Sequence, residues 1–159
     1  MQQSEFETLL ARFSAAVERD GGAALGALFT EDGIYHDIFY GAFQGRTKIA
    51  EMLDDHFWAH GEAYRWEMKE PIVSGDTGYA HWTFGFTSKL PEVAGKRILW
   101  DGMSRFQLKD GLIAHYKEVF DIAIALSQSD FGADRIARIV ARHVENLRSR
   151  EAGGTHLPA

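Results

Sequence analysis

The sequence predicts an α+β fold in which helices cover one face of a curved antiparallel sheet, followed by an extra C-terminal helix. Apolar residues recur at helical spacing in roughly the first third of the chain. From residue 63 to 121 the period changes to two, which is typical of strands. Helical spacing returns at 133–149. Helices first, then consecutive strands, then a helix indicate segregated layers and not alternating βα units.

Three helices are predicted in the first part of the chain, at residues 4–19, 22–29 and 46–58. The first has a continuous apolar face that includes Phe6 and Phe13. The third follows a glycine-rich turn and has a similar stripe. Each of these faces needs a partner layer, which the sheet supplies.

The strands are separated by short turn sequences, so they should pair as consecutive hairpins. The "KDG" sequence at 109–111 is a tight hairpin turn of this kind. The predicted strands span residues 34–39, 63–74, 79–90, 97–108 and 112–121, with a second short strand or a loop at 40–45.

The chain is predicted to form one domain, 1–159, with a core at about 4–122. The C-terminal helix at about 133–149 has one apolar side, so it should dock and not float. The glycine-containing tail at 150–159 should be frayed.

Composition excludes several classes of protein. The 17 Lys and Arg against 23 Asp and Glu leave a net charge of −6, which argues against binding to nucleic acid. Cysteine is absent, so neither disulfides nor thiolate chemistry is expected. The N-terminal residues do not have the order of a signal peptide, and no apolar run is long enough to cross a membrane, so a cytoplasmic protein is predicted.

The segment "GIYHDIFYGAFQGR", residues 33–46, places a carboxylate among bulky apolar residues. Because strand side chains alternate, Tyr35 and Asp37 share one face. Asp37 is then either a capped turn residue or a carboxylate in an apolar pocket. His56 and His60 have i, i+4 spacing, but "HFWAH" lacks the glutamate of a zincin, so no metal and no cofactor is expected.

An aromatic row follows the strand at 79–90. Trp82, Phe84 and Phe86 alternate with His81 and Thr83. We expected this row on the outer, convex face of the sheet, where it would need a second layer or a partner subunit. That reasoning predicts a homodimer formed through the sheet.

Three segments, "ALFTEDGIYHD", "FQGRTKIAEML" and "SRFQLKDGLIAHYKEVFD", resemble the NTF2-like superfamily, and in particular its SnoaL-like branch. The resemblance covers about residues 4–122. It implies a cone-shaped α+β fold with a deep apolar pocket, commonly assembled as a homodimer.

Functional positions of related families fall on identifiable residues. In ketosteroid-isomerase-like members a carboxylate base sits on the first strand, and Asp37 matches that position. Their oxyanion-hole tyrosine falls at Phe13. In limonene-epoxide-hydrolase-like members the water-activating set falls at Thr83, Gly85 and Glu118, of which only Glu118 is a carboxylate.

The resemblance places these positions on the pocket face and so predicts a site. The candidate catalytic residues are Asp37, His81, Glu118 and Tyr35. The candidate ligand-binding residues are Phe13, Thr83, Trp100, Gly102, Tyr116 and Phe120. A carboxylate in an apolar pocket has a raised pKa and can take a proton next to a carbonyl group.

Three functions remain open at this point. The first is a cofactor-independent isomerase, dehydratase or cyclase that acts on a small apolar or cyclic carbonyl ligand. The second is a non-catalytic module of the same fold that binds a ligand or a partner protein. The third is a structural homodimer. Convergence of Asp37, His81 and Glu118 would favour the enzyme.

Overall fold

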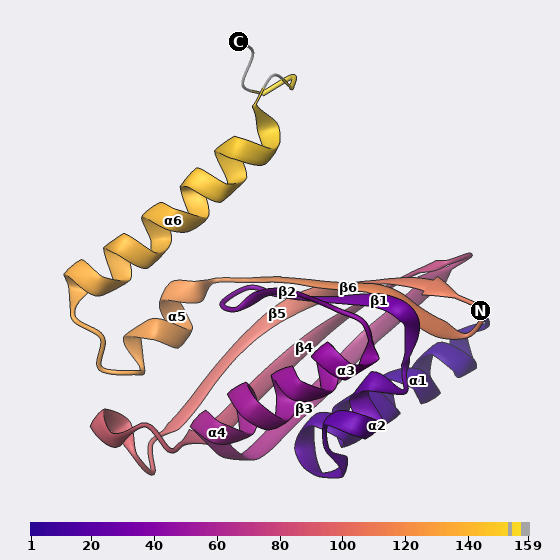
Figure 1. Ribbon diagram of the computed structural model, residues 1–159, viewed down its shortest axis with the longest axis horizontal. Helices are drawn as coiled ribbons and strands as arrows, with labels where there is room; N and C mark the ends of the chain where they lie inside the picture. Colours follow the sequence, from indigo (N-terminus) through magenta and orange to yellow (C-terminus); the bar gives the residue numbers. More distant parts are fainter. Residues whose placement is uncertain (153, 157–159) are drawn as a thin grey trace. The chain divides into compact units, whose positions relative to one another are not determined.

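The computed structural model describes residues 1–152 and 154–156. The chain divides into two compact units, Met1–Asp121 and Ile122–Ala159. The first unit combines N-terminal helices with a six-stranded sheet (Figure 1), and the second contains helices. The predicted α+β class with a C-terminal helix is therefore confirmed.

The predicted helices of the first unit are present, and two of them continue into π-helical turns. The helix predicted at 4–19 forms as α1 (Gln3–Ala15) followed by η1 (Ala16–Asp20). The helix predicted at 22–29 forms as α2 (Gly22–Gly26) and ends earlier, because Phe29 begins the first strand. The helix predicted at 46–58 forms as α3 (Arg46–Glu51), η2 (Met52–Phe57) and α4 (Trp58–His60).

The two π-helical turns are tied to neighbouring backbone. Trp58 Nε1 donates a hydrogen bond to the carbonyl of Val17 in η1, at 3.0 Å. Asp54 in η2 accepts one from the backbone N–H of Gly22, at 2.8 Å. A Cβ at Gly22 would collide with the Ala50 carbonyl, so glycine is needed where these helices meet. The contacts hold the helical layer together under the sheet.

The sheet has the strand order β2-β1-β6-β5-β4-β3. Consecutive strands from β3 to β6 pair antiparallel, as predicted, but β1 and β6 pair parallel, which makes the sheet mixed. Asp110 and Gly111 both have positive φ, of 51° and 80°, in the tight turn between β5 and β6. The strands are β1 (Phe29–Asp37), β2 (Gly41–Gln44), β3 (Gly61–Ser74), β4 (Thr77–Ser88), β5 (Arg97–Lys109) and β6 (Leu112–Phe120); η3 (Pro91–Val93) precedes β5.

The helices cover one face of the sheet, which we call the inner face (Figure 1). Phe6 and Phe13 of α1 are fully buried against it. Phe13 makes edge contacts with Phe106 at 5.7 Å and lies 5.1 Å from Tyr116, measured between ring centroids. The hydrophobic core therefore lies between α1 and the inner face, as the apolar stripe of the first helix predicts.

The aromatic row of β4 faces inward, so its predicted outer position is wrong. Trp82 and Phe84 are buried, whereas His81 and Thr83 are partly exposed on the outer face. The pairing of β4 with β5 gives the reason. Trp82 lies opposite Gly102, and a Cβ at Gly102 would come within 2.6 Å of the indole ring. The missing side chain makes room for Trp82 on the inner face.

The outer face carries other apolar side chains. Met103 and Val119 are register partners on β5 and β6 and are 48% and 61% exposed. The aromatic row, being buried on the inner face, gives no support to a dimer through the sheet.

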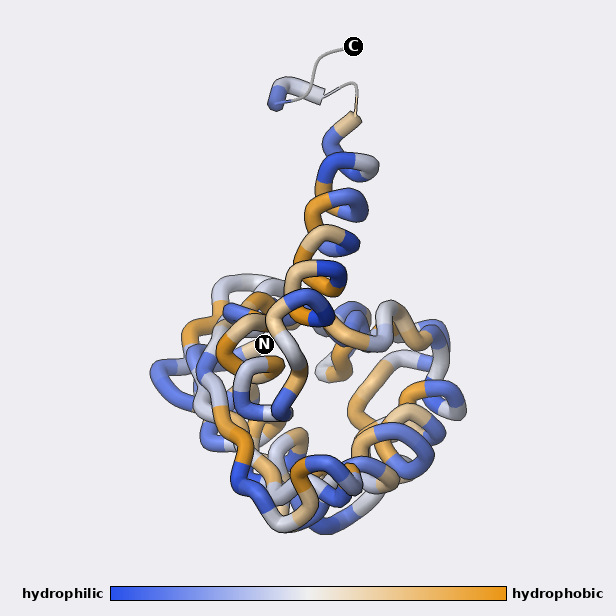
Figure 2. The backbone as a smooth tube through the Cα atoms, turned by 90° about the vertical axis from the view of Figure 1, so that its left-hand side faces the viewer, coloured by the Kyte–Doolittle hydropathy of each residue, from blue (hydrophilic) through white to orange (hydrophobic). Residues whose placement is uncertain are grey.

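The second unit contains α5 (Ile122–Ser127) and α6 (Ala133–Glu151). Hydrophobic residues recur along one side of α6 and hydrophilic residues along the other (Figure 2). This confirms the predicted helix, which reaches two residues further than 149. Of the predicted tail at 150–159, residues 153 and 157–159 lie outside the described residues. No helix within the described residues is long and apolar enough to cross a membrane.

Candidate active site

The parallel pairing of β1 and β6 brings the predicted carboxylates together. Tyr35 is the register partner of Tyr116, and their ring centroids are 4.4 Å apart. Side chains two residues further along each strand lie on the same face. Asp37 therefore lies beside Glu118 on the inner face, where both are buried, with exposed fractions of 3% and 7%.

Asp37 combines the two roles that the sequence left open. Its Oδ1 accepts hydrogen bonds from the backbone N–H groups of Phe39 and Tyr40, both at 2.7 Å, so it caps the turn after β1. Burial nevertheless raises the pKa of Asp37 from 3.8 to about 6. The two backbone hydrogen bonds and the charge of His56 oppose this rise. The Asp37 carboxyl therefore caps a turn, is buried, and has a pKa close to neutral pH.

Glu118 is the more strongly perturbed of the pair. Burial, followed by the negative charge of Asp37, raises the pKa of Glu118 from 4.5 to about 8. Hydrogen bonds from the Tyr116 hydroxyl, at 2.7 Å, and from the Ile38 backbone act in the opposite direction. Burial and the charge of Asp37 therefore disfavour the ionised form of Glu118 more strongly than burial disfavours that of Asp37.

Tyr35 presents a buried hydroxyl next to the two carboxyls. Burial raises the pKa of Tyr35 well above its ordinary value, and the charges of Glu118 and Asp37 raise it further. The neighbouring Tyr116 acts in the opposite direction and lowers the pKa of Tyr35. Tyr35 Oη nevertheless meets no partner at hydrogen-bond geometry among the described residues. A neutral, unpaired donor is thus available in the site.

Aromatic rings wall the site on the side of the β1–β2 turn. Phe120 lies 5.5 Å from Trp100 and 5.5 Å from Phe39, measured between ring centroids. Phe39 and Tyr40 are 38% and 45% exposed. The turn that Asp37 caps is therefore the part of the site nearest to solvent.

The structure brings most of the predicted site residues to one face and leaves two out. His81 and Thr83 lie on the outer face, because the inner positions of β4 belong to Trp82 and its alternate neighbours. His81 Nε2 lies 3.6 Å from Asp101 Oδ2, and Thr83 accepts a hydrogen bond from Lys69 Nζ at 3.0 Å. The predicted positions of His81 and Thr83 in the pocket are wrong. The residues on the inner face are Tyr35, Asp37, Glu118, Tyr116, Trp100, Gly102, Phe120 and Phe13.

Sequence reasoning missed residues near the carboxyl pair. His56 of η2 acts on Asp37 electrostatically and stacks on Tyr40, with ring centroids 5.3 Å apart. His56 follows Met52 at helical spacing, so the apolar stripe of its helix could have placed it inward. Ser104 lies on the inner face and accepts a hydrogen bond there from Trp82, which the sequence analysis placed on the outer face.

The sequence model of the SnoaL-like domain matches residues 10–116 of the chain. This chain belongs to the SnoaL-like family. The match runs from Leu10 in α1 to Tyr116 in β6 and confirms the predicted resemblance. No curated protein matches the chain.

Solved structures show the same fold for this SnoaL-like protein. A protein from Catenulispora acidiphila DSM 44928 with a ketosteroid isomerase-like fold, in complex with trimethylamine, is 22% identical with a TM-score of 0.71 and covers 79% of this chain and 95% of its own. An LEH-like epoxide hydrolase from M. tuberculosis is 14% identical with a TM-score of 0.65 and covers 79% and 89%. TerC, co-crystallised with polyporic acid, is 15% identical with a TM-score of 0.67 and covers 80% and 99%.

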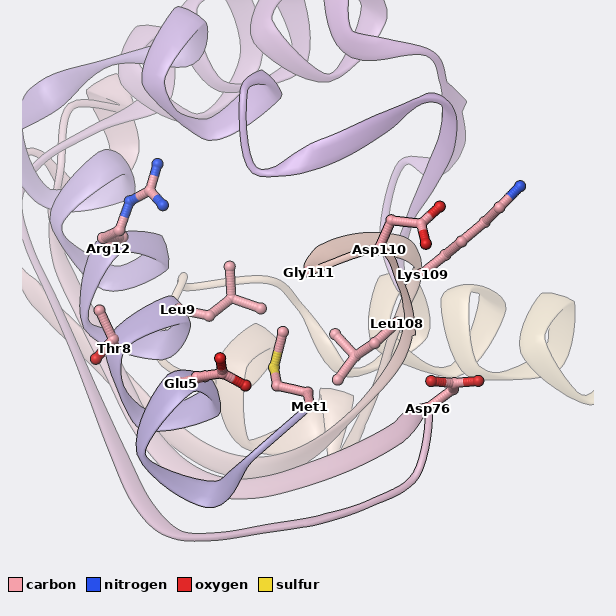
Figure 3. A pocket seen from close by; sticks show the side chains of 10 residues that line it. All are labelled: Met1, Glu5, Thr8, Leu9, Arg12, Asp76, Leu108, Lys109, Asp110 and Gly111. Atoms are coloured by element: carbon pink, nitrogen blue, oxygen red, sulfur yellow. The ribbon is translucent and has the colours of Figure 1, made fainter.

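A hollow of about 400 Å³ lies elsewhere on this SnoaL-like protein, between α1 and the turns at the far ends of β3 and β5 (Figure 3). Leu9 and Leu108 form its floor. Arg12 and Lys109 are balanced by acidic side chains around the rim, namely Glu5, Asp76 and Asp110. No buried, unpartnered polar atom of the described residues belongs to its lining. The chemistry therefore points to the carboxyl pair.

Among the described residues, no group of three His, Cys, Asp or Glu side chains is arranged to hold a metal ion. The side chains of the candidate site, two carboxyls and hydroxyls in an aromatic setting, suit proton transfer.

Proposed function

We propose that this SnoaL-like protein is a cofactor-independent acid–base enzyme, an isomerase, dehydratase or cyclase, that acts on a small apolar or cyclic carbonyl compound. The observation that carries the proposal is the buried pair of Asp37 and Glu118, whose environments push their pKa values apart. Such a pair supplies a base and an acid at the same pH.

In the proposed mechanism Asp37 is the base. At neutral pH its carboxylate is ionised, and a pKa near 6 makes it stronger than an ordinary aspartate. It would take a proton from the carbon next to the carbonyl group. Protonated Glu118 and the unpaired hydroxyl of Tyr35 would donate hydrogen bonds to the carbonyl oxygen, where negative charge develops.

The ligand class follows from the surroundings of the pair. Trp100, Phe120 and Phe39 offer aromatic surface, and the only charge expected at pH 7 on the pair is that of Asp37. An apolar ring with one carbonyl oxygen fits these groups. Similar folds crystallised with trimethylamine and with polyporic acid support a small organic ligand.

The proposal is tested by hydrogen exchange in D₂O. Cyclic ketones are first screened for binding by ligand-observed NMR, and the binders are then followed for loss of the hydrogens next to the carbonyl. Wild-type protein should catalyse the exchange. Asp37→Asn should keep binding and lose exchange by about 100-fold or more, the range of general-base catalysis. Asp101→Asn, which changes an exposed carboxylate on the outer face, is the control and should exchange normally.

The alternative is a non-catalytic ligand-binding module, and one observation favours it. Asp37 Oδ1 is already occupied by two backbone hydrogen bonds, which is what a purely structural carboxylate would show. Ketones that bind but never exchange, with Asp37→Asn equal to wild type, would support this function instead.

We also propose that the protein is a homodimer through the outer face of the sheet and resides in the cytoplasm. Exposed Met103 and Val119 lie opposite each other in the β5–β6 register and give the face an apolar centre. Burying such surface contributes about 25 cal/mol per Å².

A further inference from the structure

A chain of three hydrogen bonds leads through the buried inner face to Glu118. Trp82 Nε1 donates to Ser104 Oγ at 2.7 Å, Ser104 Oγ donates to Tyr116 Oη at 2.8 Å, and Tyr116 Oη donates to Glu118 Oε2 at 2.7 Å. Trp82, Ser104 and Tyr116 are each no more than 1% exposed. Water therefore does not compete for these groups, and the chain is set by the protein alone.

The direction of the chain follows from its first member. An indole N–H can only donate, so Ser104 Oγ must accept from Trp82. The single proton of Ser104 is then given to Tyr116, and the single proton of Tyr116 goes to Glu118. Reversing the last two bonds would aim two donors at Ser104 and leave its own proton without an acceptor among the hydrogen bonds of the chain.

The register of the sheet builds this arrangement. Ser104 is the partner of Glu118 across β5 and β6, so the two side chains emerge side by side. Trp82 reaches Ser104 over Gly102, whose missing Cβ leaves the space that the indole fills. Trp82, Ser104 and Glu118 all lie on strands, so the sheet itself holds them in place.

The direction has a consequence at Glu118. Because Oε2 always accepts the Tyr116 proton, a protonated Glu118 must carry its own hydrogen on Oε1. Since the Tyr116 proton is committed to Glu118, it is not given to Tyr35.

We propose that Trp82 and Ser104 are positioning residues that act through Tyr116 to hold Glu118 Oε2 as an acceptor and so direct the acidic hydrogen on Oε1 toward the ligand. The assignment of that hydrogen to a ligand rests on the proposed function. The polarisation of Glu118 by the chain does not, and it can be measured without a substrate.

The test is a pH titration of the Glu118 carboxyl carbon by NMR, in full-length protein labelled with ¹³C-glutamate and assigned with Glu118→Gln. In Ser104→Ala the Tyr116 hydroxyl loses the donor that polarises it, and in Trp82→Phe Ser104 loses its own donor. In both variants Tyr116 should become a weaker donor to the carboxylate. The pKa of Glu118 should then rise by about 0.5 or more above its wild-type value. Ser104→Thr, which keeps the hydroxyl, should restore the wild-type titration.

Trp66→Phe is the matched control. Trp66 is a buried neighbour of Trp82, with ring centroids 5.7 Å apart, but its Nε1 has no hydrogen-bond partner among the described residues. Its replacement removes the same atoms from the same aromatic cluster without removing any hydrogen bond of the chain, so the titration of Glu118 should stay at the wild-type position.

Three results would overturn the proposal. One is an unchanged Glu118 titration in both Ser104→Ala and Trp82→Phe. Another is an equal change in Trp66→Phe, which would indicate a packing effect. The third is that Ser104→Ala and Trp82→Phe both fail to fold while Trp66→Phe folds, because the chain would then be structural. Since no substrate is used, a negative D₂O exchange result beside shifted titrations would reject the proposed function alone.

Discussion

Tyr35 and Tyr116 face each other across the parallel strands β1 and β6, with ring centroids 4.4 Å apart. The same register carries Asp37 to Glu118 two residues further on. One pairing of strands from opposite ends of the core thus assembles the hydroxyls and the carboxyls of the candidate site.

Glu118→Gln should change how stability depends on pH. The pKa of Glu118 is raised to about 8 in the folded protein, so its contribution to stability is present below about pH 4.5 and is lost as the pH rises through 8. The variant should therefore gain stability relative to wild type between pH 5 and pH 9, by an amount on the order of a few kcal/mol. Urea unfolding at pH 5, 7 and 9 measures this difference. Glu92→Gln, at an exposed position, should follow the wild-type curve.

Asp37 should contribute to stability through its cap on the turn. Asp37→Ala leaves the N–H groups of Phe39 and Tyr40 without their acceptor, which should cost about 1–3 kcal/mol in the free energy of unfolding. Asp37→Asn keeps an acceptor oxygen and should cost much less. Equal losses in both variants, measured by urea unfolding at pH 7, would contradict the capping role.

Tyr35→Phe and Tyr116→Phe should act in opposite directions on stability. The Tyr35 hydroxyl is buried without a partner, so its removal should leave the protein equally stable or stabilise it by up to about 1 kcal/mol. The Tyr116 hydroxyl makes two hydrogen bonds, so its removal should cost about 1–3 kcal/mol. Thermal unfolding of the two variants side by side decides this. A strong loss in Tyr35→Phe would show that its hydroxyl is paired.

The proposed dimer predicts a response at the centre of the outer face. Met103→Glu puts a charge on an apolar position of the sheet and should convert the dimer to monomers without unfolding it. Sedimentation at micromolar concentration measures the change. Ile72→Glu, at another exposed apolar position, on β3, is the control and should stay dimeric. Wild-type protein that sediments as a monomer would reject the interface.

The C-terminal helix is expected to have a docking role. Truncation after Phe131 removes α6 with its apolar side, and we expect a lower melting temperature or a changed oligomeric state. Calorimetry and sedimentation of the truncated chain measure both. If neither changes, α6 is an independent appendage.

Much of the candidate site followed from the strand period. Alternation placed Tyr35 and Asp37 on one face of their strand, and Tyr116 and Glu118 on one face of another strand. The resemblance to the SnoaL-like family then placed both pairs in the same site. His81 was misplaced because the family positions were carried onto Thr83 and Gly85, which put the polar side of β4 in the pocket. The structure instead buries the apolar side, with Trp82 and Phe84, as is usual for an alternating strand.

By itself, the sequence determined the α+β class, the helical stripes and the hairpin turns, because these depend on neighbours within a few residues of each other. Only the tertiary structure decided that Trp82 points inward, because that choice depends on the space above Gly102 on another strand. Only the tertiary structure, likewise, gave Asp37 and Glu118 their raised pKa values. Burial raises both values, and the charge of Asp37 raises that of Glu118 further; both causes exist only after β1 has paired with β6.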